Sequence, residues 1–206
     1  MTVAPTVHII DDDPAVRKSL KMVMESASLA VRIYESGEAF LDEVDPHQSG
    51  CMVLDLRMPG MSGIELLQKL RAANNHVPAI VISGHVDVPT AIRSMKLGAV
   101  DLLEKPVEPR VLVDAVRSAI RTSIESQQLR GERDSITQRL ARLTPRERAL
   151  LELLVAGMPN KLIAAKLGIS AKTVANHRAS LMKKTQALNA ADLSRLCTIA
   201  GIRPPE

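Results

Sequence analysis

The stretch "VHIIDDDPAVR", residues 7–17, decides the fold of the first part of the chain. A short apolar run ends at three adjacent carboxylates, Asp11, Asp12 and Asp13, and a helical pattern opens at Pro14. Apolar runs of this length are typical of buried strands. Neighbouring carboxylates repel one another, so packing alone gives no reason to collect them. They therefore predict a positively charged ligand at the end of a strand.

The same alternation of strand and helix continues to about residue 121. Further short apolar runs at 29–34, 51–56, 78–83 and 100–104 are predicted strands. The segments between them space their apolar residues three and four apart, as helices do. This pattern predicts an α/β fold, with a five-stranded parallel sheet doubly wound by helices on both faces.

Beyond residue 121 the pattern changes. Residues 123–142 are polar with sparse apolar positions, which predicts an exposed helical linker that Gly131 allows to break. Later residues show short helical patterns and no strand-like run. We therefore expect an α/β domain over 1–122, a helical linker over 123–142 and a smaller all-α domain over 143–206.

Charge is divided unevenly between these parts. Residues 1–125 carry 13 Lys+Arg against 17 Asp+Glu, whereas residues 126–206 carry 14 against 6. An acidic first part suits a metal or phosphoryl site, and a basic second part suits a polyanion such as nucleic acid. The alternative interpretation is that these charges only solvate the surface and that their uneven distribution arose by chance.

Composition places the chain among ordinary globular proteins, with 46% hydrophobic residues. We expect Cys51 and Cys197 to be reduced thiols of a cytosolic protein. No stretch approaches the roughly 18 apolar residues of a membrane span, and the N-terminus lacks a basic region followed by an apolar one. The prediction is a cytoplasmic protein without a membrane partner.

Polar residues follow four of the predicted strands. Asp11 and Asp12 follow the first strand, Asp55 ends the third, Ser83 follows the fourth and Lys105 the fifth. Ligands of open parallel sheets collect at the carboxyl ends of the strands, so these side chains should converge at one edge. A lone Asp after a strand is more often a helix cap or turn residue, but five converging groups favour a site.

The converging side chains are of the types that bind a metal ion and a phosphoryl group. Crowded carboxylates suit a hard divalent cation, Mg²⁺ or alternatively Mn²⁺. With the cation bound, Asp55 is placed to act as a nucleophile toward a phosphoryl group. Lys105 and Ser83 are placed to bind phosphoryl oxygens through a charge and a hydrogen bond.

The motifs "IIDDD", "VLDLRMPGMSG", "VISGH" and "LLEKP" resemble, in order and spacing, the receiver domain of two-component response regulators. The resemblance implies that Asp55 accepts a phosphoryl group from a cognate histidine kinase. It implies metal binding by Asp12, Asp55 and the backbone carbonyl of Arg57, with Asp11 in the acidic pocket through a water. Ser83 and Lys105 would bind the phosphoryl group.

The resemblance also implies a cis bond between Lys105 and Pro106. Asp13 has no role in the pocket and is expected to cap the first helix.

The chain departs from the receiver pattern at Leu102, where receivers often carry the Tyr or Phe that takes part in the switch. The signal would then run through Ser83 and the loop 84–89. Arg57 and His85 occupy positions that tune phosphoryl lifetime in this family, or are plain surface residues.

The stretch "LTPRERALLELLVAGMPNKLIAAKLGISAKTVANHRASLMKKT", residues 143–185, resembles the LuxR or NarL type of helix-turn-helix, and the two domains together resemble FixJ-like regulators. From the residues, Thr144 and Glu147 form a capping box, Asn160 opens a short helix, and Ser170 caps a second helix after the turn "GIS". Such a second helix enters the major groove of DNA.

Helical phase separates the two faces of that second helix. Val174 and Leu181 should face the core, which leaves Lys172, Asn176, Ala179 and Lys183 outside. Asn176 is the strongest candidate base reader, because an amide bonds adenine bidentately. The predicted DNA-binding residues are Lys161, Lys172, Thr173, Asn176, His177, Arg178, Lys183 and Lys184, although His177 could instead pack internally.

The leading hypothesis is a transcription factor controlled by phosphorylation of Asp55. Phosphorylation would favour a homodimer through the helix 88–97 and the strand that follows it, and would release the basic domain onto two-fold promoter DNA. RNA polymerase is a further candidate partner.

Two alternatives remain from the sequence. An aspartyl-phosphate hydrolase would carry a second acid two positions after the nucleophile, where this chain has Arg57, so we expect no enzyme. A DNA-binding protein that ignores phosphorylation stays open because of Leu102.

Overall fold

A computed structural model describes residues 4–45, 48–85 and 87–202, so Val86 of the loop 84–89 lies outside the described residues. Contacts divide the chain into two units, with the boundary between Gln127 and Gln128. Among the described residues, no helix combines the length and the apolar character that a membrane crossing requires.

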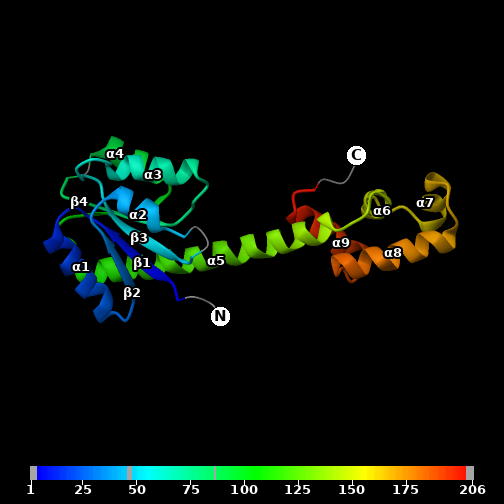
Figure 1. Cartoon of the computed structure of the whole chain (residues 1–206), viewed down its shortest axis with the longest axis horizontal. Helices are drawn as coiled ribbons and strands as arrows, with labels where there is room; N and C mark the ends of the chain where they lie inside the picture. Colours follow the sequence, from blue (N-terminus) through cyan, green and yellow to red (C-terminus); the bar gives the residue numbers. More distant parts are fainter. Residues whose placement is uncertain (1–3, 46–47, 86, 203–206) are drawn as a thin grey trace. The chain divides into compact units, whose positions relative to one another are not determined.

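The first unit is built on a five-stranded sheet (Figure 1). Its strands are β1 (Thr6–Ile10), β2 (Ala30–Tyr34), β3 (Gly50–Asp55), β4 (Ala79–Ser83) and β5 (Ala99–Glu104). All neighbours pair in parallel, in the order β2-β1-β3-β4-β5. The predicted parallel sheet is confirmed.

Helices cover both faces of this sheet. They are α1 (Pro14–Ser26), α2 (Gly37–Glu43), α3 (Gly63–Ala72), α4 (Val88–Lys96) and the start of α5 (Pro109–Ala141). Successive strand residues point to opposite faces, so Val7 and Ile9 pack in one core with residues of α1 and α5. Ile10 packs in the other core with residues of α2 and α3. The doubly wound architecture is therefore confirmed.

The helix α5 differs from the expected exposed linker. It runs without a break through Gly131, whose missing side chain faces open space. Ile136 and Leu140 are buried in the core of the second unit, four residues apart on one helix face. The later part of the expected linker 123–142 therefore belongs to the second core, because its sparse apolar residues recur at helical spacing.

Beyond α5, the regular secondary structure in the described part of the second unit is helical, with short turns between the helices. Its helices are α6 (Pro145–Val155), α7 (Asn160–Leu167), α8 (Ala171–Thr185) and α9 (Ala190–Ile199). Thr144 forms the predicted capping box with Glu147, and Ser170 caps α8. Gly168 ends α7 at φ 66°, a left-handed conformation that favours glycine and lets the chain turn into α8. The predicted all-α helix-turn-helix is confirmed.

Candidate functional site

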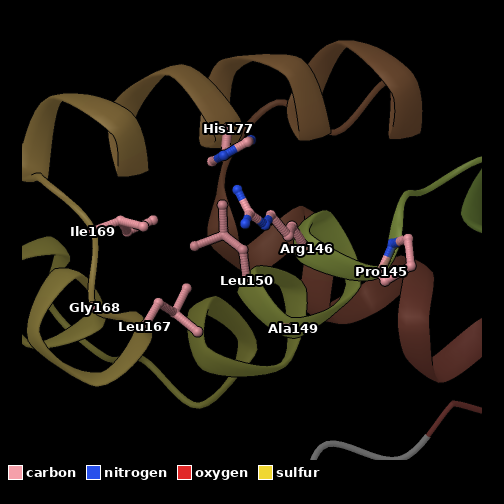
Figure 2. A pocket seen from close by; sticks show the side chains of 8 residues that line it. All are labelled: Pro145, Arg146, Ala149, Leu150, Leu167, Gly168, Ile169 and His177. Carbon is pink, nitrogen blue, oxygen red and sulfur yellow. The ribbon is translucent and has the colours of Figure 1, made fainter.

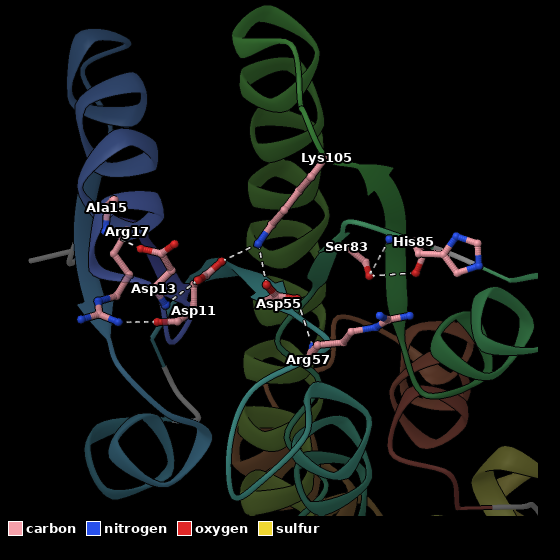
Figure 3. Close-up of polar contacts among 9 residues, drawn as sticks. All are labelled: Asp11, Asp13, Ala15, Arg17, Asp55, Arg57, Ser83, His85 and Lys105. Carbon is pink, nitrogen blue, oxygen red and sulfur yellow. Dashed lines mark hydrogen bonds and ion pairs between the residues drawn. The ribbon is translucent and has the colours of Figure 1, made fainter.

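Three charged residues from three strand ends meet at the carboxyl edge of the sheet (Figure 3). Lys105, which follows β5, places its Nζ 2.8 Å from Asp11 Oδ2 and 2.5 Å from Asp55 Oδ2. Asp11 is fully buried and Asp55 is 8% exposed. Because β1, β3 and β5 run parallel, their carboxyl ends bring these distant residues together.

Asp12 completes an acidic cluster at this edge. One carboxylate oxygen from each of Asp11, Asp12 and Asp55 lies within 4.8 Å of the other two. Asp12 is exposed, whereas the other two carboxylates are buried. Three carboxylates, one of them open to solvent, fit the oxygen-ligand preference of a hard divalent cation.

Local structure fixes the two buried aspartates. The backbone N–H of Asp13 donates to Asp11 Oδ1 at 2.9 Å, and Arg17 Nη1 donates to the Asp11 carbonyl at 2.6 Å. The N–H of Arg57 donates to Asp55 Oδ1 at 3.0 Å. As expected, Asp13 caps α1, through a 2.8 Å bond from the Ala15 N–H. Each carboxylate is thus held by the turn that leaves its own strand.

A glycine permits the close packing behind Asp55. A Cβ on Gly63 would lie 2.4 Å from the carbonyl oxygen of Asp55 and 2.9 Å from Leu56 Cα. No side chain fits at this separation, so α3 can start directly against the end of β3 only because residue 63 is glycine.

Burial and charge shift the proton affinities in the pocket. Burial raises the pKa of Asp11, although its hydrogen bond from Lys105 opposes this shift. Burial alone would lower the pKa of Lys105, but its hydrogen bonds to Asp11 and Asp55 outweigh burial and the pKa is raised. Lys105 therefore keeps its positive charge, and the pocket can hold an anion beside it.

Ser83 is fully buried at the end of β4, and its hydroxyl is turned to the loop that follows. Ser83 Oγ donates to the carbonyl oxygen of His85 at 3.0 Å (Figure 3). This donor is therefore occupied by the loop backbone in the structure, which the sequence did not indicate. The Lys105–Pro106 bond is cis, as the resemblance implies.

Leu102 is half-buried and packs at the edge of the core that lies under α2 and α3. The two aromatic residues of the chain, Tyr34 and Phe40, contact each other and His8 with ring centroids 5.3 to 5.7 Å apart. Tyr34 lies on β2, at the opposite edge of the sheet from β5, and Phe40 lies on α2. The Arg57 and His85 side chains are exposed beside the pocket.

The helix α8 presents a polar stripe to solvent. Val174 and Leu181 are fully buried, as their spacing predicts. The residues on the opposite side, Lys172, Asn176, Ala179 and Lys183, are exposed, as is Lys161 on α7. A helix with this exposed face offers two ammonium groups and one amide to a polyanion.

Three other predicted DNA-binding residues are bonded inside the unit. Thr173 Oγ1 shares a hydrogen bond with the cap residue Ser170 at 2.8 Å. Arg178 Nη1 donates to Asn160 Oδ1 at 3.1 Å, and Lys184 Nζ lies 2.7 Å from Glu147 Oε2. DNA contact by these residues stays a prediction, but each already has a partner within the fold.

Sequence reasoning identified Glu147 only as a capping residue. Glu147 is 3% exposed, and its carboxylate also accepts a 2.8 Å hydrogen bond from Ser180 Oγ on α8. The hydrogen bond from Lys184 lowers the pKa of Glu147 to about 2, with help from Thr144 and Ser180. No local pattern links residues 147 and 184, which meet only when α6 packs on α8.

Comparisons with known proteins match one family model to the α/β unit and another to the helical unit. Residues 7–117 match the family model of the response regulator receiver domain, and residues 141–197 match that of the bacterial regulatory proteins of the luxR family. The transcriptional regulatory protein FixJ of Azorhizobium caulinodans is 46% identical over 200 residues, covering 97% of this chain and 95% of that protein. FixJ of Rhizobium meliloti is 43% identical, covering 97% and 98%.

Solved structures of response regulators also resemble this chain. The response regulator StyR matches with a TM-score of 0.89 at 40% identity, covering 95% of this chain and 99% of that one. Full-length FixJ from B. japonicum matches with a TM-score of 0.57 at 41% identity, covering 98% and 100%.

Proposed function

This chain belongs to the FixJ-like response regulators, which join a receiver domain to a LuxR-type DNA-binding domain, and we propose that Asp55 is the residue that accepts the phosphoryl group. The chain is accordingly a two-component regulator of transcription. The observation that carries the assignment of Asp55 is the bridge of Lys105 between Asp11 and Asp55 at the carboxyl edge of the sheet.

The proposed donor is a phosphohistidine of a cognate kinase. A carboxylate oxygen of Asp55 forms a bond to phosphorus while the bond from phosphorus to the histidine nitrogen breaks. Lys105 already lies at bonding distance from the Asp55 carboxylate, so a small displacement pairs its ammonium with a phosphoryl oxygen. The Arg57 N–H keeps Asp55 oriented during this step.

Asp12, Asp55 and the backbone carbonyl of Arg57 would hold Mg²⁺, or Mn²⁺, with Asp11 acting through a water. When bound, the cation neutralises the negative charge that gathers on the phosphoryl oxygens. The clustered oxygens of Asp11, Asp12 and Asp55 support this set.

Ser83 is the proposed switch residue. A phosphoryl oxygen on Asp55 would compete with the His85 carbonyl for the Ser83 hydroxyl. Loss of the bond to His85 would free the loop that leads into α4. The switch therefore needs no aromatic side chain at Leu102, because the loop is bonded to Ser83 directly.

The surface that would respond lies on α4 and β5. Val88, Ile92 and Met95 of α4 are 72%, 52% and 50% exposed, and Val100 of β5 is 43% exposed. Apolar side chains gathered on one exposed face favour association. We assign the phosphorylation-dependent homodimer to this face.

Two copies would then bind a two-fold promoter site through α8. Lys161, Lys172 and Lys183 are the proposed phosphate contacts, and Asn176 is the proposed base reader. The other predicted DNA-binding residues lie beside this stripe: Thr173, His177, Arg178 and Lys184.

The test is intact mass of the full-length protein with a small phosphoryl donor, with and without Mg²⁺. We expect a metal-dependent gain of one phosphoryl group in the wild type and none in Asp55→Asn. The matched control is Asp13→Asn, which removes a neighbouring carboxylate that caps α1 and should still be phosphorylated. Equal gain in Asp55→Asn would move the acceptor to another residue.

DNA binding of the same samples separates the remaining alternative. Stimulation by the donor in wild type but not in Asp55→Asn supports control by phosphorylation. Equal DNA binding with and without phosphorylation would make the chain a DNA-binding protein whose affinity for DNA does not depend on phosphorylation.

A further inference from the structure

A cleft of about 350 Å³ lies between α6, α8 and the turn that joins α7 to α8 (Figure 2). Leu150, Leu167 and Ile169 form its apolar floor, and Arg146 and His177 bring nitrogen atoms to it. Figure 2 shows the guanidinium of Arg146 directed toward the His177 ring. The cleft therefore combines an apolar surface with two hydrogen-bond donors.

Among the residues that the structure describes, Arg146 and His177 make no polar contact that would stabilise the fold. Arg146 is exposed and His177 is half-buried. Within the described ranges, neither side chain has a hydrogen bond or an ion pair. The neighbouring basic residue on the same side of α8, Lys184, is by contrast paired with Glu147. A guanidinium without a partner beside an imidazole is suited to an anion.

The cleft adjoins the exposed stripe of α8. His177 directly follows Asn176, so it projects from the flank of α8 between the exposed stripe and the buried side. The contact of Arg178 with Asn160 shows that the start of α7, with Lys161, lies against the opposite flank. Basic groups thus border α8 on both sides.

Double-stranded DNA would present phosphates to these basic groups on both flanks of α8. A helix in the major groove lies between two sugar-phosphate backbones, one along each flank. On the α7 flank, Lys161 is available for one backbone. On the α6 flank, Lys184 is paired with Glu147, whereas Arg146 and His177 are donors that have no partner among the described residues.

We propose that Arg146 and His177 together bind a phosphate of the DNA backbone on the α6 flank of α8. The inference rests on the proposed function and adds Arg146, which the helix-turn-helix pattern did not indicate. The apolar floor would contact the carbon atoms of the adjoining deoxyribose. An organic acid in the cleft is the competing occupant, and DNA is favoured because the cleft borders the stripe of α8.

The experiment measures binding of the full-length protein, treated with Mg²⁺ and a phosphoryl donor, to a duplex enriched from a random pool by the wild type. Affinity is measured at several salt concentrations. Each phosphate contact contributes about 0.9 to the slope of log affinity against log salt. Arg146→Ala should therefore lower that slope by about 1 and weaken binding about fivefold at 0.15 M salt.

Arg148→Ala is the matched control, because Arg148 is also exposed on α6 but does not line the cleft. It should keep the wild-type slope, and Arg146→Lys should restore most of it. If the two groups share one phosphate, the loss in Arg146→Ala/His177→Ala should be smaller than the product of the single losses. Circular dichroism melting verifies that each variant is folded.

The possible failures are distinguishable. A wild type that enriches no duplex overturns both the proposed function and this inference. If the wild type binds and Lys172→Ala weakens binding, but Arg146→Ala behaves like Arg148→Ala, the DNA-binding function stands and the phosphate site is wrong. Independent, multiplicative effects of Arg146→Ala and His177→Ala would overturn their sharing of one phosphate.

Discussion

His8 is an imidazole inside the receiver core. It is 5% exposed, its Nδ1 lies 3.2 Å from the Tyr34 hydroxyl, and its ring contacts Phe40. Burial, with a smaller contribution from the positive Arg32, lowers the pKa of His8 from 6.5 to about 4. The unfolded chain therefore binds a proton at mildly acidic pH that the folded receiver excludes.

This shift predicts a pH dependence of receiver stability. The contribution of His8 is complete above about pH 6.5 and is lost as the pH falls toward 4, since protonation then favours the unfolded state. We expect the free energy of unfolding to drop by about 1–2 kcal/mol between pH 7.5 and 5 on account of this group. His8→Phe should remove that part of the drop.

The single tyrosine of the chain makes the measurement specific. Tyr34 lies in the receiver and the chain has no tryptophan, so tyrosine fluorescence during urea unfolding reports the receiver alone. Equal pH dependence in wild type and His8→Phe would contradict the assignment.

Between secondary-structure elements, the ion pair of Glu147 and Lys184 joins α6 to α8. The Glu147 carboxylate is nearly inaccessible and receives bonds from Thr144, Ser180 and Lys184. Removing Lys184 would leave a buried carboxylate without its cation, which costs more than the lost contact itself. The pair therefore fixes α8 on α6.

Lys184→Met should destabilise the C-terminal unit by about 1–3 kcal/mol. The adjacent Lys183→Met is the matched control, because Lys183 is exposed on the stripe of α8. That control should keep the melting temperature and instead lower the salt dependence of DNA binding. Thermal melting followed by far-ultraviolet circular dichroism compares the two, and equal melting temperatures would show that the ion pair contributes nothing.

For the whole molecule, the proposed switch couples Asp55 to self-association through α4 and β5. Ile92 lies in the middle of the exposed apolar face of α4. Ile92→Glu would place a carboxylate where apolar side chains meet, which should weaken the phosphorylated dimer at least about tenfold. The acceptor pocket is untouched, so phosphorylation itself should persist.

Analytical ultracentrifugation with and without the phosphoryl donor measures this effect. Met22→Glu is the control, because Met22 is 62% exposed on α1, a different helix of the receiver. It should dimerise like the wild type. A dimer that survives Ile92→Glu but not Met22→Glu would move the interface to α1.

The sequence predicted the sheet and the acidic pocket because both depend on local pattern and topology. The alternation of short apolar runs with helical segments determines a parallel sheet, and such a sheet aligns the carboxyl ends of its strands. Asp11 and Lys105 directly follow β1 and β5, and Asp55 is the last residue of β3, so their meeting follows from the strand order. The buried phase of Val174 and Leu181 on α8 follows from helical periodicity in the same way.

Only the tertiary structure decided the path of the loop after β4 and the contacts between elements that are distant in the chain. The bond of Ser83 to the His85 carbonyl depends on the path of a loop, the pairing of Lys184 with Glu147 on the packing of α8 against α6, and the inclusion of Ile136 in the second core on the course of α5. The position of Arg146 beside His177 likewise depends on the packing of α6 against α8. Periodicity determines which side of an element is buried, but the partner of each side chain depends on which elements pack together, and no local pattern records that.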